Sequence, residues 1–572
     1  MRIESRQVPD QLPDLGKLPP LLTRLYAARG VREARELERG LKNLLPFQQL
    51  RGVEAAVAVL QDALVRQQAI LVIGDFDADG ATASAVAVLA LRSLGAARVD
   101  YLVPNRFEYG YGLTPEIVEV ALQRSPDLLL TVDNGISSVE GVAAAREAGL
   151  RVVVTDHHLP GPELPAADAI VNPSQPGCNF PSKAIAGVGV VFYVMLALRA
   201  ALRQAGWFGS SCPEPNLAEL LDLVALGTVA DVVPLDANNR ILVHQGLARI
   251  RSGRCRPGIR ALLQVAGRAP ERLVAADLGF IVGPRLNAAG RLDDMSLGIE
   301  CLLAEDGSEA LTMAQALDGL NQDRKAIERD MQQQALGVLE ATWVEDEQMP
   351  FGLCLFQPEW HQGVIGILAS RLKERYHRPV IAFADAGDGL LKGSARSVPG
   401  LHVRDALDAV AARYPGLISK FGGHAMAAGL SLPQTHFEDF CAAFDNEVRR
   451  HLCADDLAGR ILSDGELRAE EFCLELATAL REAGPWGQHF PPPGFHGEFV
   501  IIQQRLVGGR HLKLALQVEG CADILDGIVF NIDLEHWPNP NVRRVLAAFT
   551  LDVNEYRDRR SLQLLINHLR PV

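Results

Sequence analysis

The chain has 572 residues, of which 48% are hydrophobic and 22% charged, and its formal net charge is −14. This length exceeds a single hydrophobic core, so roughly three or four domains are expected, and the composition excludes extensive disorder. The first residues lack an apolar signal segment, and no later stretch approaches the roughly 18 uncharged apolar residues of a membrane span, which predicts a soluble, cytoplasmic protein. The negative charge requires that any nucleic-acid contact use a local basic groove.

The first half of the chain predicts a mostly parallel sheet. Residues 1–50 predict a helical lead-in. From about residue 69, short apolar runs alternate with helical patterns, as in repeating strand–helix units. Nearly continuous apolar strands are typical of a parallel sheet with helices on both faces. Strands are expected within 69–75, 99–104, 127–133 and 151–156, and helices within 81–95, 114–124, 139–149, 188–206 and 216–229.

The second half predicts a long helix and two further domains. A polar helical pattern from Ser308 to about Thr342 would span on the order of 50 Å and connect two domains. A second, smaller α/β segment follows Pro350, and the strand-like runs after about residue 460 fit a small antiparallel barrel of the OB type. The expected fold class is α/β, with a lead-in at 1–50, a parallel-sheet domain at 51–295, a connecting helix at 296–348, a smaller α/β domain at 349–455 and the barrel at 456–572.

Three of the predicted strands lead into acidic residues. The residues concerned are Asp75, Asp77, Asp79, Asp133, Asp156, His157 and His158. Ligands of open α/β sheets bind beyond the carboxyl ends of the strands, so these side chains are expected to converge on one place. Carboxylates packed together repel one another and would protonate or destabilise the fold unless cations neutralise them.

Bound divalent metal ions resolve that conflict. Carboxylate oxygens mixed with imidazole nitrogens suit Mn²⁺ or Mg²⁺, and so many ligands favour two ions. A pair of ions activates water and steadies both the attacking and the leaving oxygen of a phosphoryl displacement. Taken singly, Asp79 fits a helix N-cap and Asp133-Asn134-Gly135 fits a turn. The joint occurrence of the three clusters, each after an apolar strand, favours the metal site.

A fourth acid, Asp231, ends an otherwise apolar helical stretch. A carboxylate there faces the negative end of the helix dipole, and a bound metal would relieve that repulsion. Capping or a salt bridge is the alternative. Asp231 considered alone does not decide between them.

At these residues the chain resembles the DHH phosphoesterase superfamily, named for the Asp-His-His found here at 156–158. A longer ordered series resembles the bacterial RecJ exonuclease family within that superfamily. The series is PNRFEYGYGL at 104–113, DNGISS at 133–138, DHHLPG at 156–161, GTVADVVPLDANNR at 227–240, GPRLNAAGRLDD at 283–294 and FGGHAMAAGL at 421–430. A single motif such as Gly-Gly-His is weak, but this series, within a resemblance that runs from about residue 50 to the C-terminus, is highly specific.

The resemblance implies how the acids divide between two metal ions. Asp75, Asp77 and Asp133 would hold one ion, and Asp133 would bridge to a second ion held by Asp79, His157 and Asp231. The resemblance also places His158 beside the substrate phosphate and gives Asp156 the task of orienting a histidine. The implied catalytic residues are Asp77, Asp79, Asp133, Asp156, His157 and His158.

Two further regions offer groups suited to phosphate. One is the loop 283–291, and the other combines residues 392–397 with residues 422–424. Glycines let the backbone approach a ligand closely, and guanidinium forks match phosphate oxygens. From composition alone, a helix start with solvated arginines and a Gly-rich turn fit these regions better. The resemblance favours substrate binding, with the second α/β domain, called DHHA1 in the family, binding the 5′ end. The expected substrate-binding residues are Arg106, Arg285, Asn287, Arg291, Ser394, Arg396, Ser397, Gly422, Gly423 and His424.

The resemblance implies a two-metal phosphodiesterase that degrades single-stranded DNA from 5′ to 3′ and releases mononucleotides, in recombination and mismatch repair. The barrel would add a stacking surface for unpaired bases, with Arg505, Arg510, His511 and Lys513 along the backbone, although barrels of this kind also bind proteins. The implied partners are a helicase and a single-strand-binding protein, and the implied state is a monomer.

Two other functions remain open at this point. The first is a DHH-type oligoribonuclease or cyclic-dinucleotide phosphodiesterase, and the predicted barrel argues against it. The second is an inactive DNA-binding scaffold. The complete set of acids argues against a scaffold, because a protein without metal ions has no electrostatic reason to keep them together.

Overall fold

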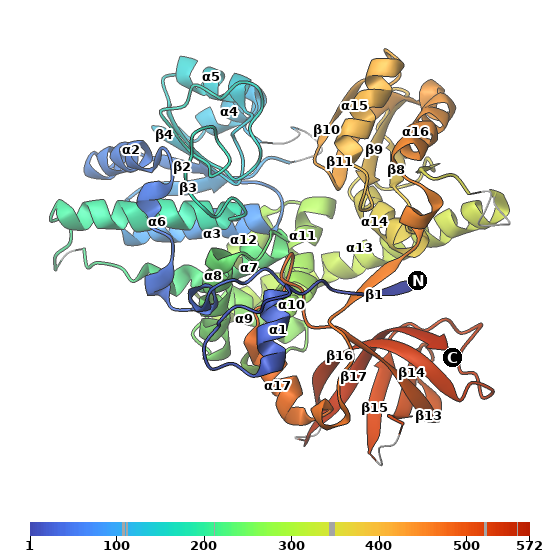
Figure 1. Cartoon of the computed structure of the whole chain (residues 1–572). Helices are drawn as coiled ribbons and strands as arrows, with labels where there is room; N and C mark the ends of the chain where they lie inside the picture. Colours follow the sequence, from blue (N-terminus) through green and yellow to red (C-terminus); the bar gives the residue numbers. More distant parts are fainter. Residues whose placement is uncertain (106–108, 110–111, 211, 343–348, 520–522, 557–558) are drawn as a thin grey trace. The chain divides into compact units, whose positions relative to one another are not determined.

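The computed structural model describes residues 1–572 except 106–108, 110–111, 211, 343–348, 520–522 and 557–558. The chain forms two compact units (Figure 1). The larger unit comprises residues 5–318 and 462–572, and the smaller unit comprises residues 1–4 and 319–461. The predicted fold class is confirmed: a parallel-sheet domain, a long helix, a smaller α/β domain and a barrel follow one another along the chain.

The larger unit contains a five-stranded sheet in the order β3-β2-β4-β5-β6, and every pairing in it is parallel. Four strands lie where the apolar runs predict them, and the three-residue β6 was not predicted. The strands are β2 (Ile70–Ile73), β3 (Val99–Leu102), β4 (Leu128–Val132), β5 (Arg151–Thr155) and β6 (Ala169–Val171). Both β2 and β4 are buried along their whole length, as expected for a sheet covered on both faces.

Helices cover both faces of this sheet. Alternate strand residues such as Leu71, Ile73 and Val152 pack against α4 (Pro115–Leu122) and α5 (Val139–Glu147). The other face carries α2 (Val53–Val65), α3 (Ala78–Ser93) and α6 (Gly187–Gln204). Helix α3 is buried on nearly every side, and its alanines, glycine and serine allow the close packing that this position demands.

Helix α6 is a long apolar helix in the core of the larger unit. It is the one helix among the described residues that has the length and apolar composition to cross a membrane. In the fold, 67% of that apolar window is buried inside the protein. A core helix of a large domain is hydrophobic for the same reason as a membrane helix, so composition alone did not separate the two.

The larger unit contains further helices that come before α13 in the chain. They are α1 (Pro20–Ala27), α7 (Leu221–Ala230), α8 (Ala237–Arg251), α9 (Pro257–Val265), α10 (Ala275–Asp277), a π-helix (Leu278–Val282), α11 (Gly283–Leu292) and α12 (Ser296–Leu303). The lead-in contains α1, three short 3₁₀ turns and β1 (Arg2–Ser5), which pairs with β12 (Arg460–Ser463).

The long helix α13 (Gly307–Thr342) has 36 residues and runs through the boundary between the units. The smaller unit has a mixed sheet in the order β10-β11-β9-β8-β7, in which only β7 and β8 are parallel. Its strands are β7 (Leu353–Phe356), β8 (Val380–Asp385), β9 (Leu390–Arg396), β10 (Lys420–Gly423) and β11 (Ala427–Pro433), and its helices are α14 (Ile365–Tyr376), α15 (Val403–Arg413) and α16 (Phe437–His451).

The C-terminal part of the larger unit is a closed barrel in the order β13-β14-β15-β17-β16. It is antiparallel except for the pairing of β15 with β17. Helix α17 (Leu474–Ala483) and a proline-rich loop come before the first strand. The strands are β13 (Phe495–Val507), β14 (His511–Gln517), β15 (Ile524–Val529), β16 (Arg544–Tyr556) and β17 (Arg559–Pro571).

A buried ion pair joins the lead-in to the segment before the barrel. Arg29 donates to both carboxylate oxygens of Asp464, at 3.0 and 2.8 Å, and the Arg29 side chain is 0% exposed. We expect Arg29→Ala to lower the free energy of unfolding by about 3–5 kcal/mol, because Asp464 would stay buried without its main partner. Arg35→Ala, at a side chain 81% exposed, should cost less than about 1 kcal/mol. Chemical denaturation of both variants tests this, and equal losses would contradict it.

Candidate metal centre

The loop after β2 brings two carboxylates to the edge of the sheet. Asp77 is the N-cap of α3, and its Oδ1 accepts from the backbone N–H groups of Asp79 and Gly80 at 2.9 and 3.0 Å. Asp75 is buried, and its Oδ1 accepts from the N–H of Phe76 at 2.7 Å. Capping therefore fixes Asp77 through one oxygen, and this role is compatible with holding a metal through the other. The N-cap interpretation that the sequence suggested for Asp79 is wrong, because Asp77 caps the helix and Asp79 lies in its first turn.

The turn after β4 holds Asp133 in an unusual backbone conformation. Its φ is +62°, in the left-handed region that few residues other than glycine adopt, although aspartate tolerates it. The next residue, Asn134, donates from Nδ2 to the carbonyls of Ile73 and Val132 at 3.0 and 2.9 Å. Asn134, which the sequence did not single out, thus ties the ends of β2 and β4 together beneath the acids.

Asp79 is anchored by the N-terminus of α6. Its two oxygens accept from the N–H groups of Gly187 and Val188 at 2.7 and 3.0 Å. A Cβ on Gly187 would lie 2.4 Å from Oδ1 of Asp133, and one on Gly227 would lie 2.8 Å from Oδ1 of Asp79. Only glycine fits at either position while the carboxylates stay where they are. Apart from the glycines themselves, no pattern in the sequence pointed to this requirement.

His157 joins the acids that follow different elements. Its Nε2 lies 3.2 Å from Oδ1 of Asp133, 3.5 Å from Oδ2 of Asp231 and 4.0 Å from Oδ2 of Asp79. Asp231 is the C-cap of α7, as the sequence placed it, and it faces this cluster. The structure therefore brings Asp231 beside residues that lie far from it in the chain.

Asp156 organises the second histidine. Its Oδ1 lies 2.7 Å from Nδ1 of His158 and accepts from the N–H groups of His157 and His158, while Oδ2 accepts from the N–H of Ile136. Burial opposes the charge of Asp156, but these hydrogen bonds and the His158 charge outweigh it and lower the pKa of the carboxyl. The same pairing outweighs burial at His158 and raises its pKa to about 9.

The metal-free cluster is electrostatically strained. Burial, followed by the charges of neighbouring carboxylates, raises the pKa of Asp75, Asp133 and Asp231 well above the usual value, and raises that of Asp79 to about 7. In this protein without ions, ionising all of these groups together is costly. The arrangement calls for cations.

The donor set fits divalent ions. Ligand atoms within 4.8 Å of one another come from Asp75, Asp77 and Asp133 in one group and from Asp79, His157 and Asp231 in another. A third group contains Asp133, His157 and His158 and connects the first two. Hard oxygen donors with one or two imidazoles are the chemistry that Mn²⁺ and Mg²⁺ accept.

The expected substrate-binding residues of the larger unit have different surroundings from one another. Arg285 lies in α11, where its guanidinium donates to the Ile281 carbonyl and pairs with Asp318 at 2.8 Å. Oδ1 of Asn287 accepts from the N–H of Ala78 at 2.8 Å, so this side chain supports the start of α3 beside the acids. Arg291 is half-buried at the end of α11, and Arg106 lies outside the described residues.

In the smaller unit, register and one hydrogen bond bring three of the six other expected substrate residues together. Ser394 on β9 pairs with Gly429 on β11, which pairs with Gly422 on β10. Arg396 donates to the Ser394 hydroxyl at 3.1 Å, and burial lowers the pKa of its guanidinium. A Cβ on Gly366, which the sequence did not single out, would lie 2.9 Å from both side chains, so the start of α14 also borders this place.

The other three expected substrate residues of the smaller unit are Ser397, Gly423 and His424, and their surroundings differ. Gly423 has a φ of +141°, and the N–H of His424 donates to the Ala427 carbonyl at 2.8 Å, which closes the β10–β11 turn. Ser397 is 1% exposed, and its hydroxyl donates to the Leu401 carbonyl at 2.8 Å. The Ser397 hydroxyl therefore serves the interior of the domain in this structure.

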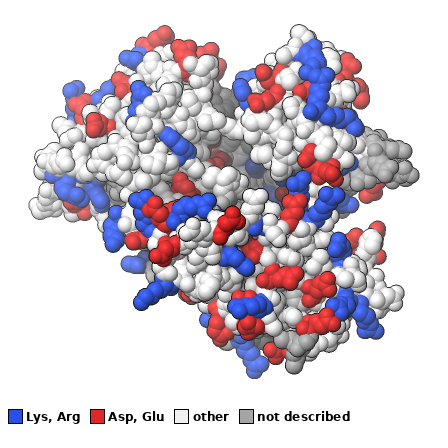
Figure 2. Space-filling model, viewed as in Figure 1, with Lys and Arg blue, Asp and Glu red and all other residues white. Residues whose placement is uncertain are grey.

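The barrel residues expected along a DNA backbone are partly neutralised. Arg505 and Lys513 lie directly opposite each other on β13 and β14, but Lys513 pairs with Asp526 at 2.6 Å. Arg510 is exposed, and His511 lies against Phe530. Figure 2 shows acidic and basic side chains mixed over the visible face of the molecule. Any binding of DNA on that face relies on individual cations and not on a broad basic stripe.

Comparison with known proteins identifies the class of protein to which this fold and site belong. Three family models match the chain: the DHH family N-terminal domain at residues 69–228, the DHHA1 domain at 349–450 and the RecJ OB domain at 463–568. The fold and the acid cluster together are those of a DHH-family phosphoesterase.

Full-length relatives identify the family within that class. The chain is 58% identical to the single-stranded-DNA-specific exonuclease RecJ of Escherichia coli, over 100% of this chain and 99% of that protein. Crystal structures of Thermus thermophilus RecJ with Mn²⁺ and with Mg²⁺ superpose with TM-scores of 0.80 and 0.74, at 31% and 28% identity, and each match covers 97% of this chain and 76% or 75% of the other. The chain belongs to the RecJ family. Its acidic residues are positioned to hold divalent metal ions, such as the Mn²⁺ and Mg²⁺ present in those two structures.

The raised pKa values predict how metal and pH act together on stability. Asp79 has a pKa of about 7 in the metal-free fold against 3.8 ordinarily, so its contribution to stability is lost as the pH rises through about 7. Bound metal needs the ionised form and removes this cost. We expect Mn²⁺ to raise the unfolding temperature more above pH 7 than below it. Without metal, Asp79→Asn should lose less stability than the unmodified chain as the pH rises through about 7. An equal loss would show that the raised pKa does not belong to Asp79.

Gly187→Ala tests the space around the cluster. The added Cβ meets Oδ1 of Asp133 at 2.4 Å, so Asp133 must move, and Mn²⁺ affinity should fall about 10- to 100-fold, as when the support of a metal ligand is disturbed. Gly307→Ala is the matched control, because Gly307 also begins a helix and has open space at its Cβ. Mn²⁺ titration of both variants gives the answer; similar affinities would show that the cluster tolerates displacement.

Proposed function

We propose that this chain is a metal-dependent exonuclease that degrades single-stranded DNA from the 5′ end and releases mononucleotides. The observation that carries this proposal is the buried convergence of Asp75, Asp77, Asp79, Asp133, His157 and Asp231 at the carboxyl ends of the strands, in a chain of the RecJ family. The similarity extends through the barrel at 463–568. An oligoribonuclease of two α/β domains and an inactive scaffold therefore lose support.

In this proposal the acids divide into two sets. Asp75, Asp77 and Asp133 hold one ion, and Asp79, Asp133, His157 and Asp231 hold the other, with Asp133 shared. The ions supply an activated water and neutralise charge on the phosphate that is attacked. The chain contributes rigid positions: the α3 cap fixes Asp77, and the start of α6 fixes Asp79.

The remaining expected residues act on the substrate. Asp156 holds His158 through Nδ1, and His158 is proposed to contact a phosphate oxygen. Arg285, Asn287, Arg291 and Arg106 are proposed to bind the strand, and the contact of Asn287 with the start of α3 beside the acids supports this for Asn287. In the smaller unit, the terminal 5′-phosphate is proposed to bind near Ser394, Arg396, Ser397, Gly422, Gly423 and His424. Arginine forks, hydroxyls and bare backbone are suited to a phosphate monoester.

The cellular setting is also part of the proposal. Membership of the RecJ family supports work in recombination and mismatch repair beside a helicase and a single-strand-binding protein. A cytoplasmic, monomeric enzyme is consistent with these roles. The barrel is proposed to bind the strand through stacking and single cations, which suits sequence-tolerant binding.

End-blocked substrates test the function. With Mn²⁺, the chain should digest a single-stranded oligonucleotide whose 5′ end is free and leave one with a blocked 5′ end intact. Asp77→Ala should reduce the rate by at least about a thousandfold, because one ion loses a ligand, while oligonucleotide binding in EDTA is kept. Asp100→Ala, which alters an exposed acid on β3 of the same sheet, is the control. Digestion from the 3′ end, or an active Asp77→Ala protein, would overturn the proposal.

A further inference from the structure

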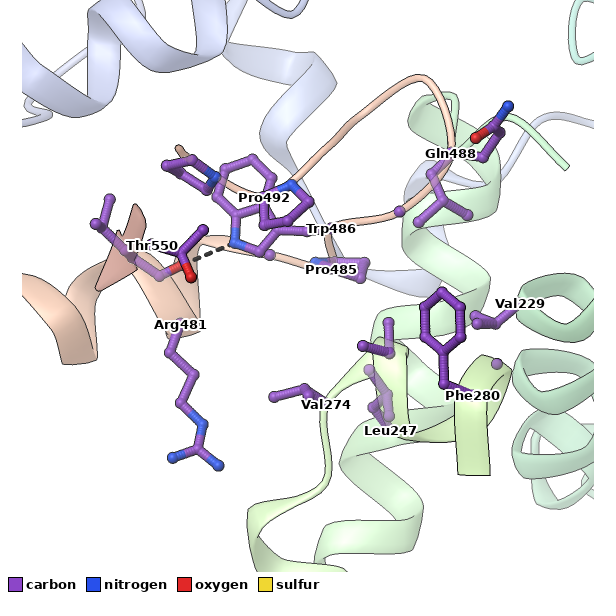
Figure 3. Close-up of a pocket in the computed structure, with 18 of the residues that line it drawn as sticks. Val229, Leu247, Val274, Phe280, Arg481, Pro485, Trp486, Gln488, Pro492 and Thr550 are labelled. Carbon is purple, nitrogen blue, oxygen red and sulfur yellow. Dashed lines mark hydrogen bonds between the residues drawn. The ribbon is translucent and has the colours of Figure 1, made fainter. Parts of the chain in front are cut away.

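The larger unit contains a pocket of about 620 Å³ between helices of its N-terminal part and the C-terminal segment that includes the barrel. One wall comes from α7, α8 and the π-helix, and the other comes from α17, the loop after it and strands β16 and β17. In Figure 3, Phe280, Val229 and Leu247 lie on one side, and Trp486 and Pro492 lie on the other. A volume of this size at a domain boundary is typical of a small-ligand site. The expected substrate residues described above are not among those that line it.

The walls suit a flat, apolar ring. The indole N–H of Trp486 donates to the Leu480 carbonyl at 2.8 Å, so its hydrogen-bonding capacity is satisfied. The Trp486 ring stacks on Phe490 at 5.1 Å and on Tyr26 at 5.9 Å, and the Arg29 guanidinium lies 5.3 Å from its centre, so these contacts hold the ring as a fixed part of the wall. Phe280 is 84% exposed, an extreme value for a large apolar side chain. Aromatic rings exposed in this way are the usual partners of nucleobases in single strands.

Two arginines line the same pocket. Arg251 donates from Nε to the Leu273 carbonyl at 2.8 Å, and no described residue accepts from its two terminal nitrogens. Arg481 donates to the Arg272 carbonyl at 2.8 Å and stays 3.6 Å from Glu555. The terminal nitrogens of Arg251 thus have donors available for an anion within an otherwise apolar site.

The electrostatic field at this end of the pocket is positive. Burial, then the charges of Arg481 and Arg39, lowers the pKa of Arg251. Burial, then Arg39 and Arg251, lowers the pKa of His244 to about 4. Glu482 and Asp552 also line the pocket, and Glu482 and Asp277 act on Arg251 in the opposite direction, but each acts less than either of the two arginines does. An anionic group is therefore favoured beside Arg251.

The pocket begins next to the metal cluster. Val229 and Val232, on either side of Asp231, both line it. Val232 is 60% exposed and has a φ of +62°, a costly conformation for a β-branched residue, and such strain concentrates at functional sites. Phe280 sits on the π-helix Leu278–Val282, another feature enriched at functional sites.

We infer that this pocket binds one nucleotide, with its base against Phe280 and its phosphate at Arg251. The nucleotide is either a unit of the strand being digested or the mononucleotide released at the metals, because both present the same base and phosphate. The inference rests on the proposed function for the origin of the nucleotide but not for the binding itself.

Two variants alter the pocket by independent means. Arg251→Gln removes the cation, and Ala276→Trp fills the space from an exposed position that lines the pocket. Arg249→Gln is the matched control, because Arg249 lies on the same helix, donates to the Arg254 carbonyl and does not line the pocket. Binding of thymidine 5′-monophosphate and of an oligothymidylate to the full chain in EDTA is measured by calorimetry, together with the unfolding temperature of each variant.

Both pocket variants should bind at least one of these ligands about tenfold or more weakly, as expected for the loss of a charge-assisted contact, while Arg249→Gln binds normally. Weaker monophosphate binding alone assigns the pocket to the product, and weaker oligothymidylate binding assigns it to the strand. Unchanged affinity for both ligands in both variants would overturn the inference. Digestion of oligothymidylate with Mn²⁺ by the unmodified chain separately decides the proposed function, since the binding data do not depend on metal.

Discussion

Mutual repulsion among buried carboxylates is the constraint on which the rest of this structure depends. Burial and neighbouring charges raise the pKa of Asp75, Asp79, Asp133 and Asp231, so the ionised cluster destabilises the fold until cations neutralise it. The parallel sheet creates this situation because it brings the carboxyl ends of its strands to one edge. Metal binding is therefore linked to folding as well as to chemistry.

The surrounding backbone keeps these charges in place before any ion binds. The N-cap of α3 fixes Asp77, and the left-handed turn at Asp133 is held by Asn134, which bonds to two strand carbonyls. Gly187 and Gly227 leave room for carboxylates where any other side chain would collide with them. Such rigidity lets ligands meet an ion without reorganisation, which is what a site needs to stabilise charge that develops during a reaction.

The chain reconciles a net charge of −14 with a polyanionic substrate by placing cations locally. Several candidate cations are already engaged: Arg285 pairs with Asp318, and Lys513 pairs with Asp526. Arg251 differs, because it sits in an apolar pocket among other arginines. Selective binding in a few concave places, and not attraction over a whole face, is the electrostatic strategy that this surface supports.

The sequence by itself determined four strands of the parallel sheet, the long helix and the acids at the strand ends, because alternating apolar runs and motif order are local signals. Tertiary structure alone decided that Asn134 ties β2 to β4 and that the Ser397 hydroxyl turns inward. It also decided that α6 is a core helix and that a pocket lies beside Phe280. These depend on contacts between residues distant in the chain, and no local pattern encodes such contacts.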